Sequence, residues 1–498
     1  MNQKATVRRE PAAAFLLAGL VLLALVLRFW RLGDWNFQAT EMFTLRDSLT
    51  PKLTNPRPLS YFLTSYLVGS FRPLDEFGLR LLPAIFGVLA VPVVYLVFRR
   101  VAGDRAALIS ALLVTVSPLQ IMYSQLARYW SLVFLLSAIY PYAIYVGVRE
   151  RSRSWLALGC VSAVLAVLAH PVSVLLLGGL GLYLVAGLRR EDLARLWSQK
   201  AIRWTVTLAL VLGAVILVVR FVPLLQGWIS MHDRSRGSGQ FLRPPAPAQG
   251  LKQVIYLANF VESLTVPVVL SAIAGIYWLW QGRDRSLARL LTSLAVFQIG
   301  FLTLLSLRTS VSTYYLLPSV PLFYLGAGIF IDQLFRVEVP WRHRWLLPAL
   351  MLAICIAAGA PTLISDARDG RRYDFRSSAH WIAARLAPAD IVFSDQPMVT
   401  AHYLFPHPVR HLRKDLGLLK DAMGELQQAG GGGALWIVAP APSHAYRPNM
   451  KEGGMSAWIY ENCQIRSTIG VGRIDFRQNY LHIYHCPSAR PLALAPDR

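Results

Sequence analysis

The chain has 498 residues, of which 55% are hydrophobic and only 15% are charged. This balance excludes a soluble globular protein of this size and indicates a membrane protein. The formal net charge is +23, but the basic residues lie in short segments between apolar runs. That pattern is typical of the topology signal of a membrane protein and argues against a nucleic-acid partner.

Apolar segments recur along the first 362 residues. A spanning helix needs about 20 mostly apolar residues, and on this criterion the sequence predicts about eleven spans. They cover residues 12–30, 79–98, 105–121, 129–148, 154–169, 172–188, 203–224, 262–280, 287–307, 312–333 and 345–362. The first run is long and lacks a cleavage motif, so we interpret it as a retained helix.

Short basic segments predict the orientation of these spans. The N-terminus and the segments RRVAGDR, RERSRS, RREDLARLWSQK, QGRDRSLAR and RVEVPWRHR all fall on one side of the membrane if the spans alternate. The positive-inside rule makes that side cytoplasmic. An odd number of spans then places the C-terminal tail outside.

Three segments lie outside the predicted spans on the external side. The first loop, 33–77, contains amphipathic pieces that predict short helices at the membrane surface. The second loop, 225–260, is rich in Gly, Pro, Ser and Arg and has no pattern of regular structure. The third is the tail, so we divide the chain into a transmembrane module, 1–362, and an exported domain, 363–498.

The tail alternates between strand and helix patterns. DIVFSD, GALWIVAP and YLHIYHC are typical of strands, and FRSSAHWIAARLA and DLGLLKDAMGELQQA are typical of amphipathic helices. The alternation predicts an open α/β sheet. Cys463 and Cys486 both lie in this exported domain, where oxidising conditions permit a disulfide, although the sequence leaves their pairing open.

Acids of the first loop are candidates for chemistry, because polar groups held near a bilayer are often functional. Asp34 and Glu41 belong to this loop, and Glu41 lies among Phe37, Met42 and Phe43. An apolar setting raises the pKa of a carboxyl group and suits it to general-base work. The alternative is that Glu41 is a solvated loop acid or a carboxylate at the start of a helix. The sequence does not decide among these interpretations.

Two basic or titratable residues lie at later external turns. Arg128 is flanked by Tyr123 and Trp130, and it can bind a lipid phosphate through two parallel hydrogen bonds or extend toward headgroups in general. His170 ends an apolar run and is more typical of a hydrogen-bonded structural group than of a metal ligand. No spacing of His, Cys, Asp and Glu resembles a closed zinc site.

Several motifs resemble those of a known family. RLGDWNFQATEMFTL, SPLQIMYSQLARYWSL and STYYLLPSVPLFYLGAG follow one another in the order found in multi-pass GT-C glycosyltransferases. The chain is most similar to the bacterial dolichyl-phosphate-mannose-mannosyltransferase-like and lipid A aminoarabinose-transferase-like group. The resemblance implies a mostly α-helical polytopic protein of GT-C fold in a bacterial cytoplasmic membrane. It implies inverting transfer of a sugar from a polyprenyl-phosphate donor to an acceptor glycan, lipid or protein outside.

The resemblance also assigns residues. The family's acidic pair falls on Thr40 and Glu41, and Glu41 then acts as the base. The family's basic residues fall on Arg57 and Arg128, which then bind the donor phosphate. Arg308, another arginine predicted to be external, is a third candidate for this role. Some members use a divalent cation. Further candidates for the site, drawn from the residues or from the resemblance, are Thr40, Asp34, Gln125, Tyr123, His170 and Tyr314.

Thr40 and Leu126 stand where the family carries acids, and three hypotheses therefore stay open. The first is a glycosyltransferase with Glu41 as its base. The second is a scaffold that binds lipid-phosphate sugars, or partners in envelope polysaccharide assembly, without transfer. The third is a lipid transporter, which the lack of an inverted repeat and of charged residues in mid-span disfavours.

Overall fold

A computed structural model describes most of the chain, in two compact units. The described residues are 11–55, 57–187, 198, 207, 255–282, 284–307, 311–337, 345–370, 373–412, 416–430, 432–440, 455–470 and 480–488. One unit comprises Met1–Leu32 and Asp47–Ala360, and the other comprises Gly33–Arg46 and Pro361–Arg498. The start of the first external loop therefore belongs to the unit of the tail.

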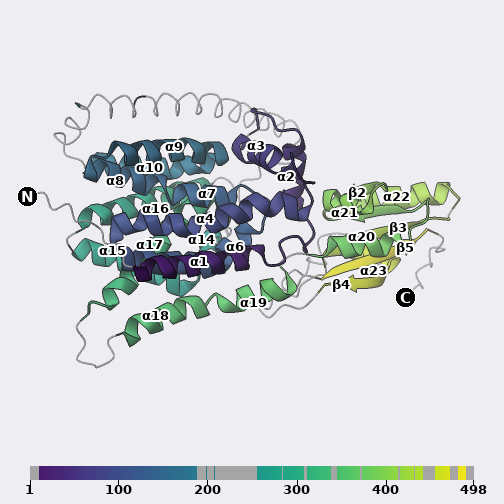
Figure 1. Cartoon of the computed structure of the whole chain (residues 1–498). Helices are drawn as coiled ribbons and strands as arrows, with labels where there is room; N and C mark the ends of the chain where they lie inside the picture. The colour runs from purple at the N-terminus through teal and green to yellow at the C-terminus, as the bar shows by residue number, and fades with distance from the viewer. Residues whose placement is uncertain are drawn as a thin grey trace, which may run out of the picture. The chain divides into compact units, whose positions relative to one another are not determined.

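The first unit is a helical bundle (Figure 1). Within the described residues, six helical stretches are long and apolar enough to cross a membrane, or up to eight if each of two bent pairs counts as one span. The six comprise α1 (Pro11–Phe29), α4 (Glu76–Ala102), α7 (Trp130–Ser137) with α8 (Tyr140–Glu150), α16 (Arg285–Ser306), the 3-10 helix η3 (Thr313–Ser319) with α17 (Val320–Leu334), and α18 (Leu346–Ala357) with α19 (Ala360–Asp369). The bent pairs are α5 (Asp104–Val116) with α6 (Pro118–Ser124), and α14 (Ile255–Leu264) with α15 (Val266–Gln281).

Shorter helices complete this account. The predicted windows 154–169 and 172–188 correspond to α9 (Arg153–Ala169) and to η1 (Pro171–Ser173) with α10 (Val174–Gly187). The first external loop contains the short helices α2 (Ala39–Leu49) and α3 (Pro58–Leu67). The window 203–224 and nearly all of the predicted loop 225–260 lie outside the described residues.

Close helix packing in the bundle depends on small residues, as is usual in membranes. A side chain on Gly275 of α15 would overlap the Gly326 carbonyl of α17. The fully buried Arg28 joins α1 to α5, because its guanidinium donates to the Val114 carbonyl at 2.9 Å and to the Thr115 carbonyl at 3.2 Å. The first contact joins two late helices of the bundle, and the second joins two early ones.

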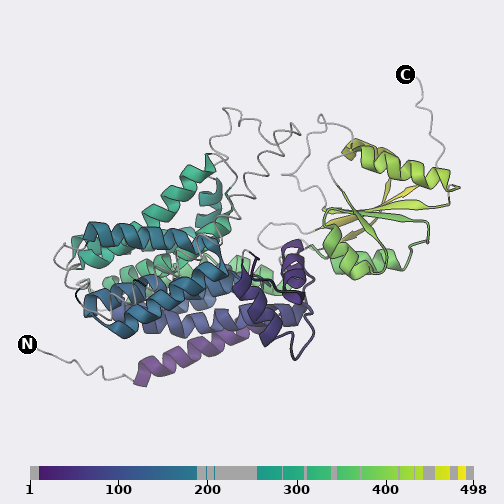
Figure 2. The same cartoon turned by 90° about the horizontal axis from the view of Figure 1, so that it is seen from above.

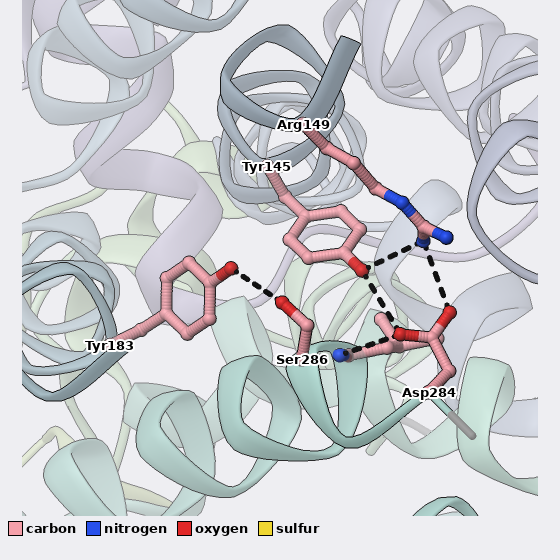
Figure 3. Close-up of polar contacts among 6 residues, drawn as sticks. Tyr145, Arg149, Tyr183, Asp284 and Ser286 are labelled. Atoms are coloured by element: carbon pink, nitrogen blue, oxygen red, sulfur yellow. Dashed lines mark hydrogen bonds and ion pairs between the residues drawn. The ribbon is translucent and has the colours of Figure 1, made fainter. Parts of the chain in front are cut away.

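Where α8 ends and α16 begins, polar side chains form a connected group, and a separate hydrogen bond joins Tyr183 of α10 to Ser286 of α16 (Figure 3). Arg149 of α8 donates to a carboxylate oxygen of Asp284 and to the Tyr145 hydroxyl, both at 3.0 Å. Asp284 also caps α16 by accepting from the Leu287 backbone N–H at 3.2 Å. The loops that begin at Arg149 and precede α16, both predicted to be cytoplasmic, therefore meet.

A cavity of about 190 Å³ lies nearby and has walls from α4, α5, α15, α16 and α17, including Asp284 and Asp332. Asp332 is buried and pairs with Arg336 at 2.7 Å and with Arg105 at 3.4 Å. Four basic segments that the sequence places on one side of the membrane thus gather at a single end of the bundle.

The second unit contains a five-stranded mixed sheet with helices on both faces (Figure 2). Its strand order is β2-β1-β3-β5-β4, with β1 parallel to β2 and β3, and with β5 antiparallel to β3 and β4. The strands are β1 (Ile391–Ser394), β2 (Val409–His411), β3 (Ala434–Pro440), β4 (Gln464–Ile469) and β5 (Leu481–Pro487). The helices are α20 (Phe375–Ala383), α21 (Pro397–Leu404), α22 (Leu416–Gln428) and α23 (Met455–Asn462).

Three strands and two helices of this unit coincide with the predicted segments. The predicted α/β sheet is present, and its edge strands β2 and β4 are additional. A disulfide joins Cys463, at the end of α23, to Cys486 in β5, and both cysteines lie in the core beneath α22 and α23. It links a peripheral helix to an inner strand of the sheet.

Candidate active site

Three loops of the first unit bring basic and aromatic side chains together. Arg57 precedes α3, Arg128 lies in the turn between α6 and α7, and His170 separates α9 from α10. All three surround Tyr129. The guanidinium groups of Arg57 and Arg128 lie 4.6 and 4.7 Å from the centroid of the Tyr129 ring. The His170 ring lies 4.8 Å from the same ring, centroid to centroid.

Local structure holds these side chains in place. Pro58 begins α3 and disfavours a helical backbone at Arg57, whose φ and ψ are −138° and 56°. Arg128 donates to the Tyr129 hydroxyl at 2.9 Å. The Ser131 hydroxyl donates to the Tyr123 carbonyl at 2.7 Å, which ties the start of α7 back to α6.

Further aromatic rings line this cluster. Trp130 lies 4.7 Å from the His170 ring and 5.0 Å from the Tyr314 ring, centroid to centroid. Tyr123 lies 6.3 Å from Trp130 and Tyr315 lies 6.0 Å from His170. Tyr123, His170 and Tyr314, each a candidate from the sequence, therefore all adjoin Trp130. We call Arg57, Arg128, Tyr129, His170 and these surrounding aromatic rings the Tyr129 cluster.

His170 is a hydrogen-bond donor without an acceptor. Its Nδ1 accepts from the Val172 backbone N–H at 3.0 Å, which places the ring proton on Nε2. Nε2 is buried and has no hydrogen-bond partner, and the residue is only 4% exposed. Burial, and then the positive charges of Arg57 and Arg128, lower the pKa of His170 well below its ordinary value. His170 therefore stays neutral and presents an N–H group.

A second unpaired donor lies in the same cluster, since the buried Nε of Arg57 also lacks a hydrogen-bond partner. A buried polar group that is left unpaired costs about 1–3 kcal/mol, so such groups are rare in folded proteins. Two such donors, one of them in the Arg57 guanidinium, together with the Arg128 guanidinium fit an anion whose oxygens accept hydrogen bonds. Phosphate oxygens match this geometry and charge.

Glu41 belongs to the second unit. It is the third residue of α2, and its Oε2 accepts from the Gln38 backbone N–H at 2.9 Å, as in a capping box. Glu41 is fully buried, as are Phe37 and Met42. Phe43 differs from the expectation, because it is 41% exposed and its ring faces the Arg46 guanidinium at 5.4 Å.

The start of α2 is bound to the tail domain. The Phe37 N–H donates to the Tyr403 hydroxyl at 2.8 Å, and the Ala39 N–H donates to Gln396 Oε1 at 3.3 Å. Arg376 donates to the Asp34 carbonyl at 3.4 Å. No local sequence pattern predicts these contacts, because Gln396 and Tyr403 are 357 and 366 residues away from their partners.

The remaining candidates have varied positions. Thr40 and Asp34 are exposed in the second unit. Gln125 Nε2 donates to the Leu27 carbonyl at 3.3 Å and to the Trp30 carbonyl at 2.9 Å, so these contacts give it a structural role at the end of α1. Arg308 lies outside the described residues. Across the part of the chain that the structure describes, no three His, Cys, Asp or Glu side chains gather as cation ligands.

Comparisons with known proteins give a family and a fold. Residues 57–222 match the family model described as dolichyl-phosphate-mannose-protein mannosyltransferase. A search of the curated proteins finds no match. The matched segment contains Arg57, Arg128 and His170, and it confirms the resemblance that the motifs indicate.

Solved structures with a similar fold include ArnT from Cupriavidus metallidurans in the apo state, with a TM-score of 0.55 and 16% identity over 96% of this chain and 100% of that chain. ArnT bound to undecaprenyl phosphate gives a TM-score of 0.53 and 15% identity over 97% and 99%. The Archaeoglobus fulgidus oligosaccharyltransferase in complex with Zn and sulfate gives a TM-score of 0.55 and 14% identity, over 85% of this chain and 68% of that chain. At these identities the likeness shows the fold. The chain is thus a multi-pass membrane protein with the fold of these solved structures, and its residues 57–222 match the dolichyl-phosphate-mannose-protein mannosyltransferase family.

Proposed function

We propose that this protein transfers a sugar from a polyprenyl-phosphate donor to an acceptor glycan, lipid or protein at the outer face of the membrane, with inversion. The observation that carries the proposal is the Tyr129 cluster, where the buried Nε of Arg57 and Nε2 of His170 lack acceptors and the Arg128 guanidinium lies close by. The family match over this segment supports it. The undecaprenyl phosphate bound by a protein of similar fold supports phosphate as the anion.

In this proposal the cluster binds the donor phosphate. Arg57 and Arg128 donate to its oxygens, and the Nε2–H of His170 provides one more hydrogen bond. Negative charge grows on the phosphate as the sugar leaves, so these donors bind the transition state more tightly than the ground state. A polyprenyl phosphate leaves without being protonated, so a neutral histidine that gives up no proton suits this role.

We assign the role of base to Glu41. The acceptor oxygen attacks the anomeric carbon and forms the new glycosidic bond while its proton passes to the Glu41 carboxylate. The bond between the anomeric carbon and the phosphate oxygen breaks, and its electron pair leaves with the polyprenyl phosphate. A single displacement of this kind inverts the anomeric configuration. The proposal routes no step through a metal ion.

We further propose that about eleven spans place the N-terminus in the cytoplasm and the tail outside. Arg128 directly precedes the span Trp130–Glu150 and Arg149 lies at its other end, so the Tyr129 cluster and the Asp284 group lie at opposite ends of this span. The basic loops meet at the Asp284 end. This arrangement supports an external position for the Tyr129 cluster.

A second candidate function is a scaffold that binds lipid-phosphate sugars without transfer. The exposed Thr40 and the half-buried Leu126 favour it, because they occupy the positions of two family acids. Neither side chain takes up a proton at neutral pH. This candidate keeps the phosphate-binding role of the Tyr129 cluster and removes only the chemical step.

The test is transfer from a radiolabelled polyprenyl-phosphate hexose or pentose by the purified protein in detergent, with and without an added divalent cation. We expect Glu41→Gln to lower turnover by roughly 100- to 10,000-fold, because a positioned base contributes a factor of this size. Asp47→Asn, which removes an acid from the same helix, is the matched control and should keep its turnover.

Donor binding separates the two candidate functions. The glycosyltransferase hypothesis requires Glu41→Gln to bind the donor as the unaltered protein does. Equal turnover of the Glu41→Gln variant and the unaltered protein would contradict the role of Glu41. If the unaltered protein binds the donor without turnover and Thr40→Asp restores some, the scaffold hypothesis is correct.

A further inference from the structure

The carboxylate proposed as the base is attached to a part of the molecule that lies far from it in the sequence. Residues Gly33–Arg46 form one compact unit with Pro361–Arg498. We infer that the tail domain positions Glu41, and that Gln396 and Tyr403 of its helix α21 are the positioning residues. The inference rests on the catalytic role proposed above for Glu41.

Three consecutive backbone N–H groups at the start of α2 carry the argument. Phe37 N–H donates to Tyr403, Gln38 N–H donates to Glu41, and Ala39 N–H donates to Gln396. The first N–H groups of a helix have no partner inside the helix, so their side-chain partners fix where the helix begins. Two of the three partners come from the tail, and the third is the Glu41 carboxylate itself.

Packing within the same unit supports these bonds. The buried Phe37 ring meets the His402 ring edge to face at 5.4 Å between centroids. The Trp35 ring approaches Gly370 so closely that a Cβ there would lie 2.8 Å from it, and Gly370 also has a φ of +70°. The guanidinium of Arg376 lies 5.3 Å from the Tyr403 ring centroid.

The helix that supplies the two partners is itself fixed to the sheet. The Ser394 hydroxyl, at the end of β1, accepts from the Gln396 N–H at 3.1 Å and lies 2.7 Å from the Thr400 hydroxyl. The Asp395 N–H donates to the Val438 carbonyl of β3 at 3.1 Å. Val399 and Leu404 of α21 are buried. Gln396 and Tyr403 therefore stand on a rigid base, which a positioning role requires.

This arrangement explains what the exported domain contributes to the reaction. A catalytic group that moves by about 1 Å can cost about 100-fold in rate, so the start of α2 needs firm support. Glu41 caps the first turn of α2, and the tail holds that turn from outside. Loss of the tail contacts changes the placement of the base and leaves the Tyr129 cluster intact.

The variants Tyr403→Phe and Gln396→Leu remove one hydrogen bond each and keep the size of the side chain. We expect each to lower kcat by about 3- to 10-fold, the value of one hydrogen bond, without changing the affinity for undecaprenyl phosphate. Tyr460→Phe, in α23 of the same domain, is the matched control. In a Glu41→Gln background, Tyr403→Phe should cause no further loss, because both changes act on the same group.

Amide hydrogen exchange of the full-length protein provides a readout that does not need activity. Exchange at residues 37–42 should become faster in Tyr403→Phe and Gln396→Leu but not in Tyr460→Phe. Unchanged kcat despite faster exchange would overturn the inference. If the unaltered protein shows no transfer, the proposed function fails, and unchanged exchange in both variants would overturn the attachment as well.

Discussion

Two arginine–tyrosine pairs lie at opposite ends of the span Trp130–Glu150. They differ in whether an acidic side chain pairs with the arginine. Arg149 lies over the Tyr145 ring, with its guanidinium 5.9 Å from the centroid, and binds the Asp284 carboxylate at 3.0 Å. Arg57 lies over the Tyr129 ring at 4.6 Å. In the part of the chain that the structure describes, Arg57 forms no ion pair with an acid, and its buried Nε has no hydrogen-bond partner.

The difference shows how one pair of residue types serves two purposes. At the Asp284 end, the Asp284 carboxylate supplies the opposite charge for Arg149 (Figure 3). The pair therefore joins α8 to α16 and needs no ligand. At the Tyr129 end, the unpaired Nε of Arg57 and Nε2–H of His170 cost stability in the absence of a ligand. A protein retains such a cost where function repays it.

The largest effect that would test this comparison is on ligand affinity. We expect Arg57→Ala to weaken binding of undecaprenyl phosphate by roughly 10- to 100-fold, since hydrogen bonds to a charged group contribute about 1.5–3 kcal/mol. Arg57→Lys should restore part of the affinity, because an ammonium keeps the charge but lacks the planar fork. Titration of the lipid in detergent measures both. Unchanged affinity of Arg57→Ala, at unchanged Tm, would remove Arg57 from the site.

The second effect is on stability as a function of pH. The pKa of His170 is well below its ordinary value, so only the unfolded chain takes up a proton at this residue as the pH falls below about 6.5. Above that pH, the neutral His170 does not lower the free energy of unfolding. Below it, the free energy of unfolding falls by at most about 1.4 kcal/mol per pH unit, until the pH reaches the lower pKa of the folded state.

Five groups face the His170 ring or act on its charge, namely Arg57, Arg128, Tyr129, Trp130 and Tyr315. None of them is an acid that would raise the pKa of His170. The Tm of the unaltered protein should therefore fall more steeply from pH 7 to pH 5 than that of His170→Phe. Parallel pH profiles would contradict the buried, neutral state of His170.

Much of the fold follows from composition. Apart from the window 203–224, each predicted apolar window coincides with one helix or with two consecutive helices, because bilayer spans need long apolar runs that are visible locally. The breaks inside the windows, such as the bends between α5 and α6 and between α14 and α15, were not predicted. The strands β1, β3 and β5 have buried apolar runs and were predictable for the same reason. The edge strand β4 is largely exposed, so its sequence QIRSTI lacks that signal.

The site was predictable only in part. The aromatic residues that flank Arg128 leave two interpretations open, a lipid phosphate or headgroups in general, and the sequence around His170 is more typical of a structural group. The convergence of Arg57 and Arg128 on Tyr129 depends on how helices pack, which no local pattern encodes. The attachment of Phe37 to Tyr403 depends likewise on tertiary structure, because 366 residues separate the two.

The third effect isolates the hydrogen bond of His170. His170→Phe keeps a flat ring among the aromatic side chains but removes the Nε2–H, and we expect it to weaken binding of undecaprenyl phosphate by about 3- to 10-fold. His170→Gln keeps an N–H donor and should lose less. The same lipid titration measures both, with Cys160→Ser in α9 as the control. Equal losses in the two variants would indicate that His170 only fills space.

The smallest effect is at the opposite end, on stability alone. Arg149→Ala leaves Asp284 beside the Tyr145 hydroxyl without its counter-charge. Because the two side chains are 55% and 30% exposed, water screens the loss, and we expect about 1 kcal/mol or less and a slightly lower Tm. The double variant Arg149→Ala/Asp284→Ala should lose less than the sum of the single variants, because each single variant already removes the pair. Affinity for undecaprenyl phosphate should not change, since the proposed binding site lies at the opposite end of the span. A weaker affinity in Arg149→Ala would mean that the Arg149–Asp284 pair and the Tyr129 cluster are coupled. The distinction between a structural end and a proposed ligand-binding end of the span would then be wrong.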